Sequence, residues 1–205
     1  MDPNELATTR RALHGVAELV IAGPQYTAAG DIRLRVVPGG FGGMASSVRV
    51  DGGDLVWDGG RVALGGTCRA LADAVGVVAG APDVYRVGSG VDPDEQLPFD
   101  PDALVALLDW FERGDAALRT FAPDEERVLW PEHFDVGYAL DEINYGVSPG
   151  DDGHPAPYAY VGPWTQREGA VWNTSFGAAR PAADLPDVDD VVKFFTEGRT
   201  AAGGG

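Results

Sequence analysis

Residues 31–36 read DIRLRV and residues 48–64 read VRVDGGDLVWDGGRVAL, and these two stretches decide the fold class. In the first, apolar and polar residues alternate strictly, as in a β-strand with one solvent-facing side. In the second, Asp-Gly pairs separate short apolar runs. Such pairs indicate hairpins, because glycine accepts the positive φ of tight turns. We therefore predict an antiparallel meander between about residues 31 and 64.

The intervening residues 38–43 read PGGFGG. A glycine-rich segment of this kind could cradle an anion with its backbone. No Lys-Ser or Lys-Thr pair follows it and no helical pattern opens from it, so it is not a phosphate-binding loop. We expect a flexible connection here.

Apolar residues at three- and four-residue spacing predict helices on both sides of the meander. In the first, Gly23-Pro24 is expected to end the helix, and His14 between apolar neighbours is expected to be structural. Gly114 is expected to separate the third from the fourth. The predicted helices cover residues 5–22, 67–79, 100–114, 115–121 and 188–197.

A second antiparallel set is expected between the fourth and last helices, at about residues 136–147, 157–162 and 171–176. The predicted fold class is α+β: an antiparallel β-sheet with about four or five helices packed against it. We expect one domain over residues 1–205. The polar, proline-containing loop 89–99 is a weak candidate boundary.

The chain of 205 residues has 32 acidic and 15 basic side chains and a net charge of −17. A negative field of this size repels phosphate backbones and anionic lipids, so we expect neither nucleic acid nor a membrane as a partner. The first residues are acidic rather than basic, and Cys68 is the single cysteine. We therefore expect a cytoplasmic protein without a secretory signal, whose oligomeric state the sequence does not indicate. Cys68 is expected to be a small buried apolar residue rather than a nucleophile.

Residues 129–180 hold two of the three histidines and three of the five tryptophans, set among Gly and Pro turns. Tyr158 and Tyr160 alternate on one predicted strand, so both rings are expected on the same face. This composition favours a shaped, concave binding surface. The tryptophans would also suit a packed core between sheet and helices, and this alternative remains open. The residues predicted to bind a ligand are Trp130, Glu132, Asn144, Tyr145, Asp151, His154, Tyr158, Tyr160 and Trp164.

The phrases LWPEHFD (129–135), NYGVSPGD (144–151) and PYAYVGPW (157–164) resemble those of a group of uncharacterised actinobacterial proteins. The resemblance covers most of the chain. It implies no activity, substrate or cofactor, because none is attached to the group.

Two functions follow as hypotheses. The first is a non-catalytic protein that binds an unidentified small molecule or protein partner through residues 130–164, without a cofactor. The alternative is a hydrolase or isomerase that uses His133 as acid or base, oriented by Asp135. For a metal-assisted form, His133, Asp135 and His154 are weak candidate ligands, but their spacing matches no known metal motif, so no metal is expected.

Overall fold

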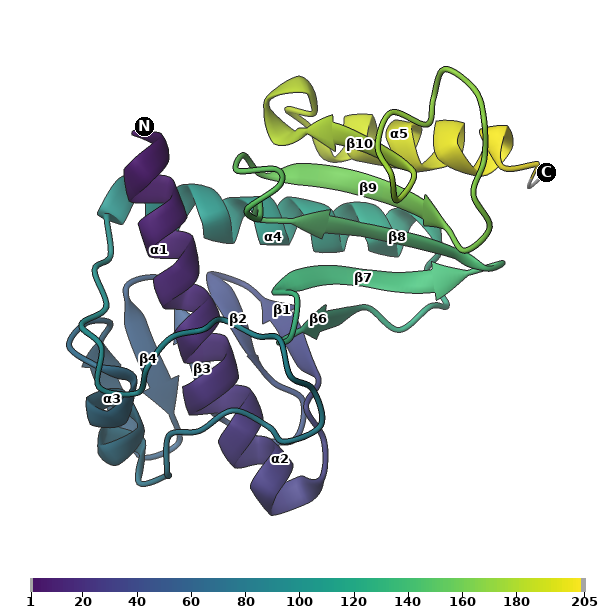
Figure 1. Ribbon diagram of the computed structural model, residues 1–205. Coiled ribbons are helices and arrows are strands. Elements are labelled where there is room, and N and C mark those ends of the chain that lie inside the picture. Colours follow the sequence, from purple (N-terminus) through teal and green to yellow (C-terminus); the bar gives the residue numbers. More distant parts are fainter. Residues whose placement is uncertain (1, 204–205) are drawn as a thin grey trace. The chain divides into compact units, whose positions relative to one another are not determined.

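The computed structural model describes residues 2–203 (Figure 1). The described chain divides into two compact units. Unit 1 comprises the chain up to Asp109 together with Leu129–Phe134, and unit 2 comprises Trp110–Val128 together with the chain from Asp135 onward. The loop 89–99, which we considered as a boundary, lies inside unit 1.

The strands of unit 1 pair antiparallel in the order β6-β1-β2-β3-β4-β5. The predicted meander is confirmed, and its hairpins turn at 38–39, 52–53 and 58–59. The prediction that residues 38–43 form a flexible connection is wrong, since Gly40–Gly43 is itself a strand. The strands and their bounds are β1 (Leu34–Val37), β2 (Gly40–Gly43), β3 (Arg49–Asp51), β4 (Asp54–Trp57), β5 (Gly60–Ala63) and β6 (Val128–Trp130).

One face of this meander is apolar and forms the core of unit 1. Leu34, Phe41, Val50 and Leu55 lie there with no exposed surface. The first helix packs on this face, and Figure 1 shows it crossing β2 and β3. The opposite face carries the charged side chains of the alternating pattern.

The first helix runs without a break through α1 (Pro3–Gly15), the π-helix η1 (Val16–Ala22) and α2 (Gly23–Ala29). Our prediction that Gly23-Pro24 ends it is wrong. Gly23 is needed for close packing, because a Cβ there would lie 1.7 Å from the carbonyl oxygen of Gly80. Pro24 is tolerated because it occupies the first turn of α2, directly after the wider π-turn.

The two other predicted helices near this part of the chain differ from expectation in length. Helix α3 (Cys68–Val75) is capped by the Thr67 hydroxyl and ends at Gly76, which has a φ of 87°. Helix α4 (Pro101–Phe121) replaces the two helices predicted over 100–121. Gly114 does not interrupt it. Its missing side chain instead makes room for Val147, which a Cβ would approach to 2.1 Å.

Unit 2 is an antiparallel ladder of β7 (Asp135–Leu140), β8 (Ile143–Ser148), β9 (Tyr158–Pro163) and β10 (Ala178–Pro181). The second half of α4, together with α5 (Val188–Ala201), covers one face. Val147 packs at Gly114 and Val161 packs at Gly198 of α5. The 3₁₀ turn η2 (Ala182–Asp184) connects β10 to α5.

Two strand predictions in unit 2 are corrected. Residues 136–147 form two strands, joined by a turn in which Asp141 and Glu142 have φ of 54° and 60°. No strand forms at 171–176, and the fourth strand lies later, at Ala178–Pro181.

The α+β class is confirmed, with antiparallel pairing in both units. The ten strands of the described chain are more than we expected. Its α-helices form four continuous helical segments when the first helix is counted as one. Among residues 2–203, none of these helices combines the length and apolar character needed to cross a bilayer.

Candidate functional site

The predicted site residues fall into both units. Trp130, Glu132 and His133 belong to unit 1, whereas the remaining candidates belong to unit 2. Each group is therefore characterised by its own contacts.

In unit 1, the phrase around His133 forms a tight structural turn. Phe134 has a φ of 54°, and its N–H donates to the carbonyl oxygen of Trp130 at 2.7 Å. The Phe134 ring stacks on His14 with centroids 5.1 Å apart, and His14 Nε2 lies 2.7 Å from the carbonyl oxygen of Pro131. Burial lowers the pKa of His14, although the contact with Pro131 opposes this shift. His14 is thus a structural residue, as expected.

The side chain of His133 itself is 69% exposed. Its Nε2 lies 3.4 Å from Glu132 Oε1. The adjacent acid therefore accompanies the imidazole, in a solvated setting that lacks the enclosure usual for an acid–base residue.

In unit 2, most predicted residues share the face of β7–β9 that points away from α4 and α5. We call it the tyrosine face. The register places Gly137, Gly146 and Tyr160 in one row across the three strands, and Ser148 opposite Tyr158. The same-face prediction for Tyr158 and Tyr160 is confirmed. The tyrosine face comprises Asp135, Asn144, Tyr158 and Tyr160, and the loop residues Asp151, His154 and Phe176 beside them.

Tyr160 lies flat across its two neighbouring strands. A Cβ on Gly146 would be 2.3 Å from the Tyr160 hydroxyl, and one on Gly137 would be 2.9 Å from it. These two glycines let the phenol reach Asp135, whose Oδ2 accepts its hydrogen bond. Burial, together with the Asp135 carboxylate, raises the pKa of Tyr160 well above its ordinary value.

The loop after β8 holds Asp151 in place. Its Oδ1 accepts from the backbone amides of Gly153 and His154, both at 2.7 Å, and its Oδ2 accepts from the Tyr158 hydroxyl at 2.6 Å. Partial burial opposes ionisation of Asp151, but these hydrogen bonds outweigh it and lower its pKa. Burial and the bond to Asp151 raise the pKa of Tyr158.

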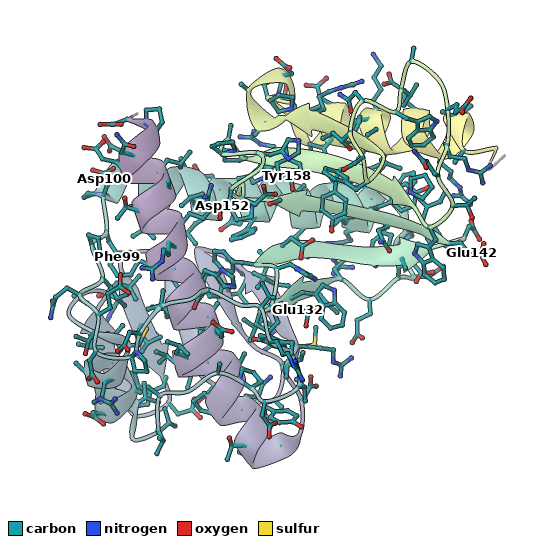
Figure 2. All side chains as sticks on the ribbon, viewed as in Figure 1. Phe99, Asp100, Glu132, Glu142, Asp152 and Tyr158 are labelled. Atoms are coloured by element: carbon teal, nitrogen blue, oxygen red, sulfur yellow. The ribbon has the colours of Figure 1, made fainter. Side chains whose placement is uncertain are left out.

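Three aromatic rings gather beside this carboxylate. His154 lies 5.2 Å from Tyr158 and 5.5 Å from Phe176, measured between ring centroids. Tyr158 is only 9% exposed, whereas Phe176 is 39% exposed. The exposed rim is therefore aromatic and acidic, and Asp152 continues it at the end of β8 and β9 marked by Tyr158 (Figure 2).

Asn144 and Trp164 lie at the other end of the tyrosine face, where Glu142 is labelled in Figure 2. Trp164 Nε1 donates to Asn144 Oδ1 at 3.1 Å, and the indole is 65% exposed. Tyr145 does not belong to this face, and this prediction is corrected. It is fully buried on the helix-covered face, where its ring lies 4.8 Å from Phe121 and 5.9 Å from Phe195.

No family model matches the chain, and searches of curated proteins and of solved structures found no significant similarity. The resemblance to the actinobacterial group therefore stays a prediction.

Residues 2–203 contain no group of three or more His, Cys, Asp or Glu side chains arranged to hold a metal ion. His154, one of the weak candidate ligands, has Asp151 3.9 Å away. Two such groups make a contact pair rather than a coordination shell.

Glu18, which we did not single out, is the most buried acid of unit 1. It lies within the π-helix and is 4% exposed. Its Oε2 accepts from the backbone N–H and the hydroxyl of Ser89, at 2.8 and 2.5 Å. A Cβ on Gly88 would lie 1.8 Å from its Oε1. Glu18 thus anchors the irregular segment 77–99 to the first helix.

Two other side chains near Glu18 have raised pKa values. Burial raises the pKa of Cys68 to about 12, with added contributions from Glu18 and Glu95. Burial also raises the pKa of Tyr85, and the negative charge of Glu18 adds to it. A thiol in this setting is the opposite of an activated nucleophile, which needs a depressed pKa.

The buried phenols of unit 2 predict a loss of stability in alkali. Burial raises the pKa of Tyr145 to about 12, and it also raises that of Tyr138. A raised pKa means that the fold favours the neutral phenol. Its contribution is therefore intact below the unfolded pKa of about 10 and is lost as the pH rises through the folded value. We expect the urea midpoint to fall above a pH of about 10.

Tyr145→Phe is the matched variant for this measurement. The Tyr145 hydroxyl is buried without a hydrogen-bond partner among the described residues, so its removal should stabilise the protein or leave it unchanged. The variant should also lose less stability in alkali than the parent. A native-state ultraviolet titration in which every tyrosine ionises near pH 10 would contradict this account.

Proposed function

We propose that the protein is a non-catalytic binding protein, and that the tyrosine face takes a cationic organic group of a small molecule or a protein partner. The observation that carries this proposal is the exposed aromatic rim of His154 and Phe176 beside the ordered carboxylate of Asp151. Aromatic faces attract ammonium and guanidinium groups, and the attraction strengthens where a carboxylate lies close.

The charge of the chain supports a cationic ligand. The net charge of −17 draws cations toward the surface and repels anions. Asp151 uses three hydrogen bonds to hold its position, and a carboxylate has about four acceptor sites. One acceptor site therefore stays available to a ligand.

The protonation states on this face favour binding over proton transfer. A general base or acid works best when its pKa lies near the working pH. The pKa of Asp151 is lowered and those of Tyr158 and Tyr160 are raised, so all three keep one protonation state near neutrality. The single buried thiol needs no oxidising compartment, which supports a cytoplasmic location.

The direct test is a calorimetric titration with tetramethylammonium and with arginine amide, using the neutral tert-butanol as a comparison. We expect saturable binding of the cations and none of the alcohol. Phe176→Ala should weaken it by about five- to tenfold, because it removes one exposed π-face. Its melting temperature should stay close to that of the parent, since the ring is 39% exposed.

The matched control is Val105→Ala, a truncation of an apolar side chain that is 59% exposed in unit 1. It should bind both cations as the parent does. Absence of saturable binding by the parent would reject the proposal, as would a Phe176→Ala variant with parental affinity.

A further inference from the structure

A second, unrelated site lies in unit 1, on the face of the meander opposite its core. The strand register places Arg35, Gly42 and Arg49 in one row across β1, β2 and β3. Partners across an antiparallel ladder point to the same face, and two strand spacings separate the arginine Cα atoms by about 10 Å. Two cations therefore flank a glycine lane.

A pocket of about 220 Å³ opens at this row. Its polar lining comes from the two arginines and from Ser46 and Ser47, in the loop that joins β2 to β3. The volume is that of about seven water molecules at liquid density. It suits a small oxyanion with some of its hydration shell.

The loop that carries the serines is held in place. Gln25, 3% exposed, accepts from the backbone N–H of Ala45 at 2.8 Å and donates to the carbonyl oxygens of Asp31 and Arg33. Gly43 makes this approach possible, because a Cβ there would be 2.3 Å from Gln25 Oε1 and 2.5 Å from Ser46 Oγ. The pocket is therefore a built feature with little ordering left to occur on binding.

The donors around the pocket lack strong partners within the described chain. Arg35 has no hydrogen bond or ion pair among residues 2–203, and the buried Oγ of Ser46 has no hydrogen-bond partner there. Arg49 meets the Asp51 carboxylate at 3.5 Å, near the limit of a hydrogen bond. An unsatisfied buried hydroxyl costs about 1–3 kcal/mol, which an acceptor atom in the pocket would offset.

We propose that the pocket between Arg35 and Arg49 binds a phosphate oxyanion, either free phosphate or the phosphoryl group of a small molecule. Guanidinium groups match phosphate oxygens with paired, charge-assisted hydrogen bonds. Ser46 and Ser47 supply hydroxyl donors at the same pocket. The overall charge of −17 keeps out polyanions, so the ligand is small. This inference concerns unit 1 and does not rest on the proposed function of unit 2.

The test is calorimetry of the full chain at fixed ionic strength with inorganic phosphate and, separately, with phenyl phosphate. We expect binding with a Kd in the millimolar range or tighter. Arg35→Gln should weaken it by about tenfold, because a charge-assisted pair is lost. The free variant should keep its melting temperature, since Arg35 is exposed and unpartnered within the described residues.

Arg61→Gln is the matched control. Arg61 lies in the same row, opposite Val56, but it pairs with Asp54 and is outside the pocket. It should bind phosphate as the parent does. Equal weakening by Arg35→Gln and Arg61→Gln would show diffuse attraction rather than a site, and would overturn the proposal.

Ser46→Ala separates ligand binding from structure. In the free protein it should be neutral or stabilising, because it removes an unpaired buried hydroxyl. It should nevertheless weaken phosphate binding. Tighter binding of phenyl phosphate than of phosphate would indicate a phosphorylated ligand, and the reverse would indicate the free anion. No binding of either up to about 10 mM would overturn the proposal.

Discussion

Glu18→Ala should lower the free energy of unfolding by about 2–4 kcal/mol, the largest effect that we expect from one side-chain truncation in unit 1. The change leaves the buried N–H and hydroxyl of Ser89 without their acceptor. In a chain of this size, the melting temperature should fall by roughly 5–15 °C. Chemical denaturation and calorimetry would measure both quantities.

Hydrogen exchange gives the local readout of the same variant. The amides of Ser89 and Val91 should exchange faster than in the parent, because Glu18 anchors their segment. Glu168→Ala, a truncation of an exposed acid, is the control and should change stability by less than about 0.5 kcal/mol. If the two variants had the same stability, Glu18 would not be an anchor.

Gly146→Ala should cost a similar amount, about 2–4 kcal/mol, in unit 2. The added methyl group would lie 2.3 Å from the Tyr160 hydroxyl and 2.6 Å from the carbonyl oxygen of Val136. Tyr160 would have to leave Asp135, so its hydrogen bond would be lost. We expect a lower melting temperature and a Tyr160 phenol that ionises at lower pH than in the parent.

Two variants test this explanation. Gly53→Ala places a methyl group where nothing lies within 4 Å, and it should be close to neutral. The double variant Gly146→Ala with Tyr160→Ala should cost less than the sum of the single changes, because the clash with the phenol is gone. Strict additivity would show that Tyr160 does not rest on Gly146.

Turn chemistry explains which strands could be predicted. Two hairpins of the meander turn at Gly52-Gly53 and Asp58-Gly59, where glycine signals the turn. The hairpin between β7 and β8 turns at Asp141 and Glu142, both with positive φ and neither a glycine. Such a turn has no signal in the residue types, so residues 136–147 were taken for one strand.

Burial of single residues was harder to predict than their periodicity. Tyr158 and Tyr160 were assigned to one face correctly, because alternation along a strand is a local property. Tyr145 was misplaced, since the face that a strand buries depends on which helices pack on it. Glu18 escaped notice because the π-helix changes the spacing at which side chains return to one face.

Glycines misled the sequence reading at two positions for one physical reason. Gly42 and Gly114 were interpreted as sites of flexibility or interruption, yet each lies in regular structure. In both cases a neighbouring side chain occupies the place of the missing one: Arg49 over Gly42 and Val147 over Gly114. Such close approach is a tertiary property, which a single sequence does not encode locally.

The π-helix sets the phase between the two ends of the first helix. In η1 the N–H of Gly23 reaches back five residues to the carbonyl oxygen of Glu18, so each turn holds more chain than an α-turn does. Removing one residue between Val16 and Ala22 would allow regular α-helical bonding while rotating everything beyond it about the axis. Gly23 would then no longer face Gly80, nor Gln25 the loop at Ala45. The length of this helix is therefore constrained to the single residue, whereas its irregular bonding would suggest a tolerant segment.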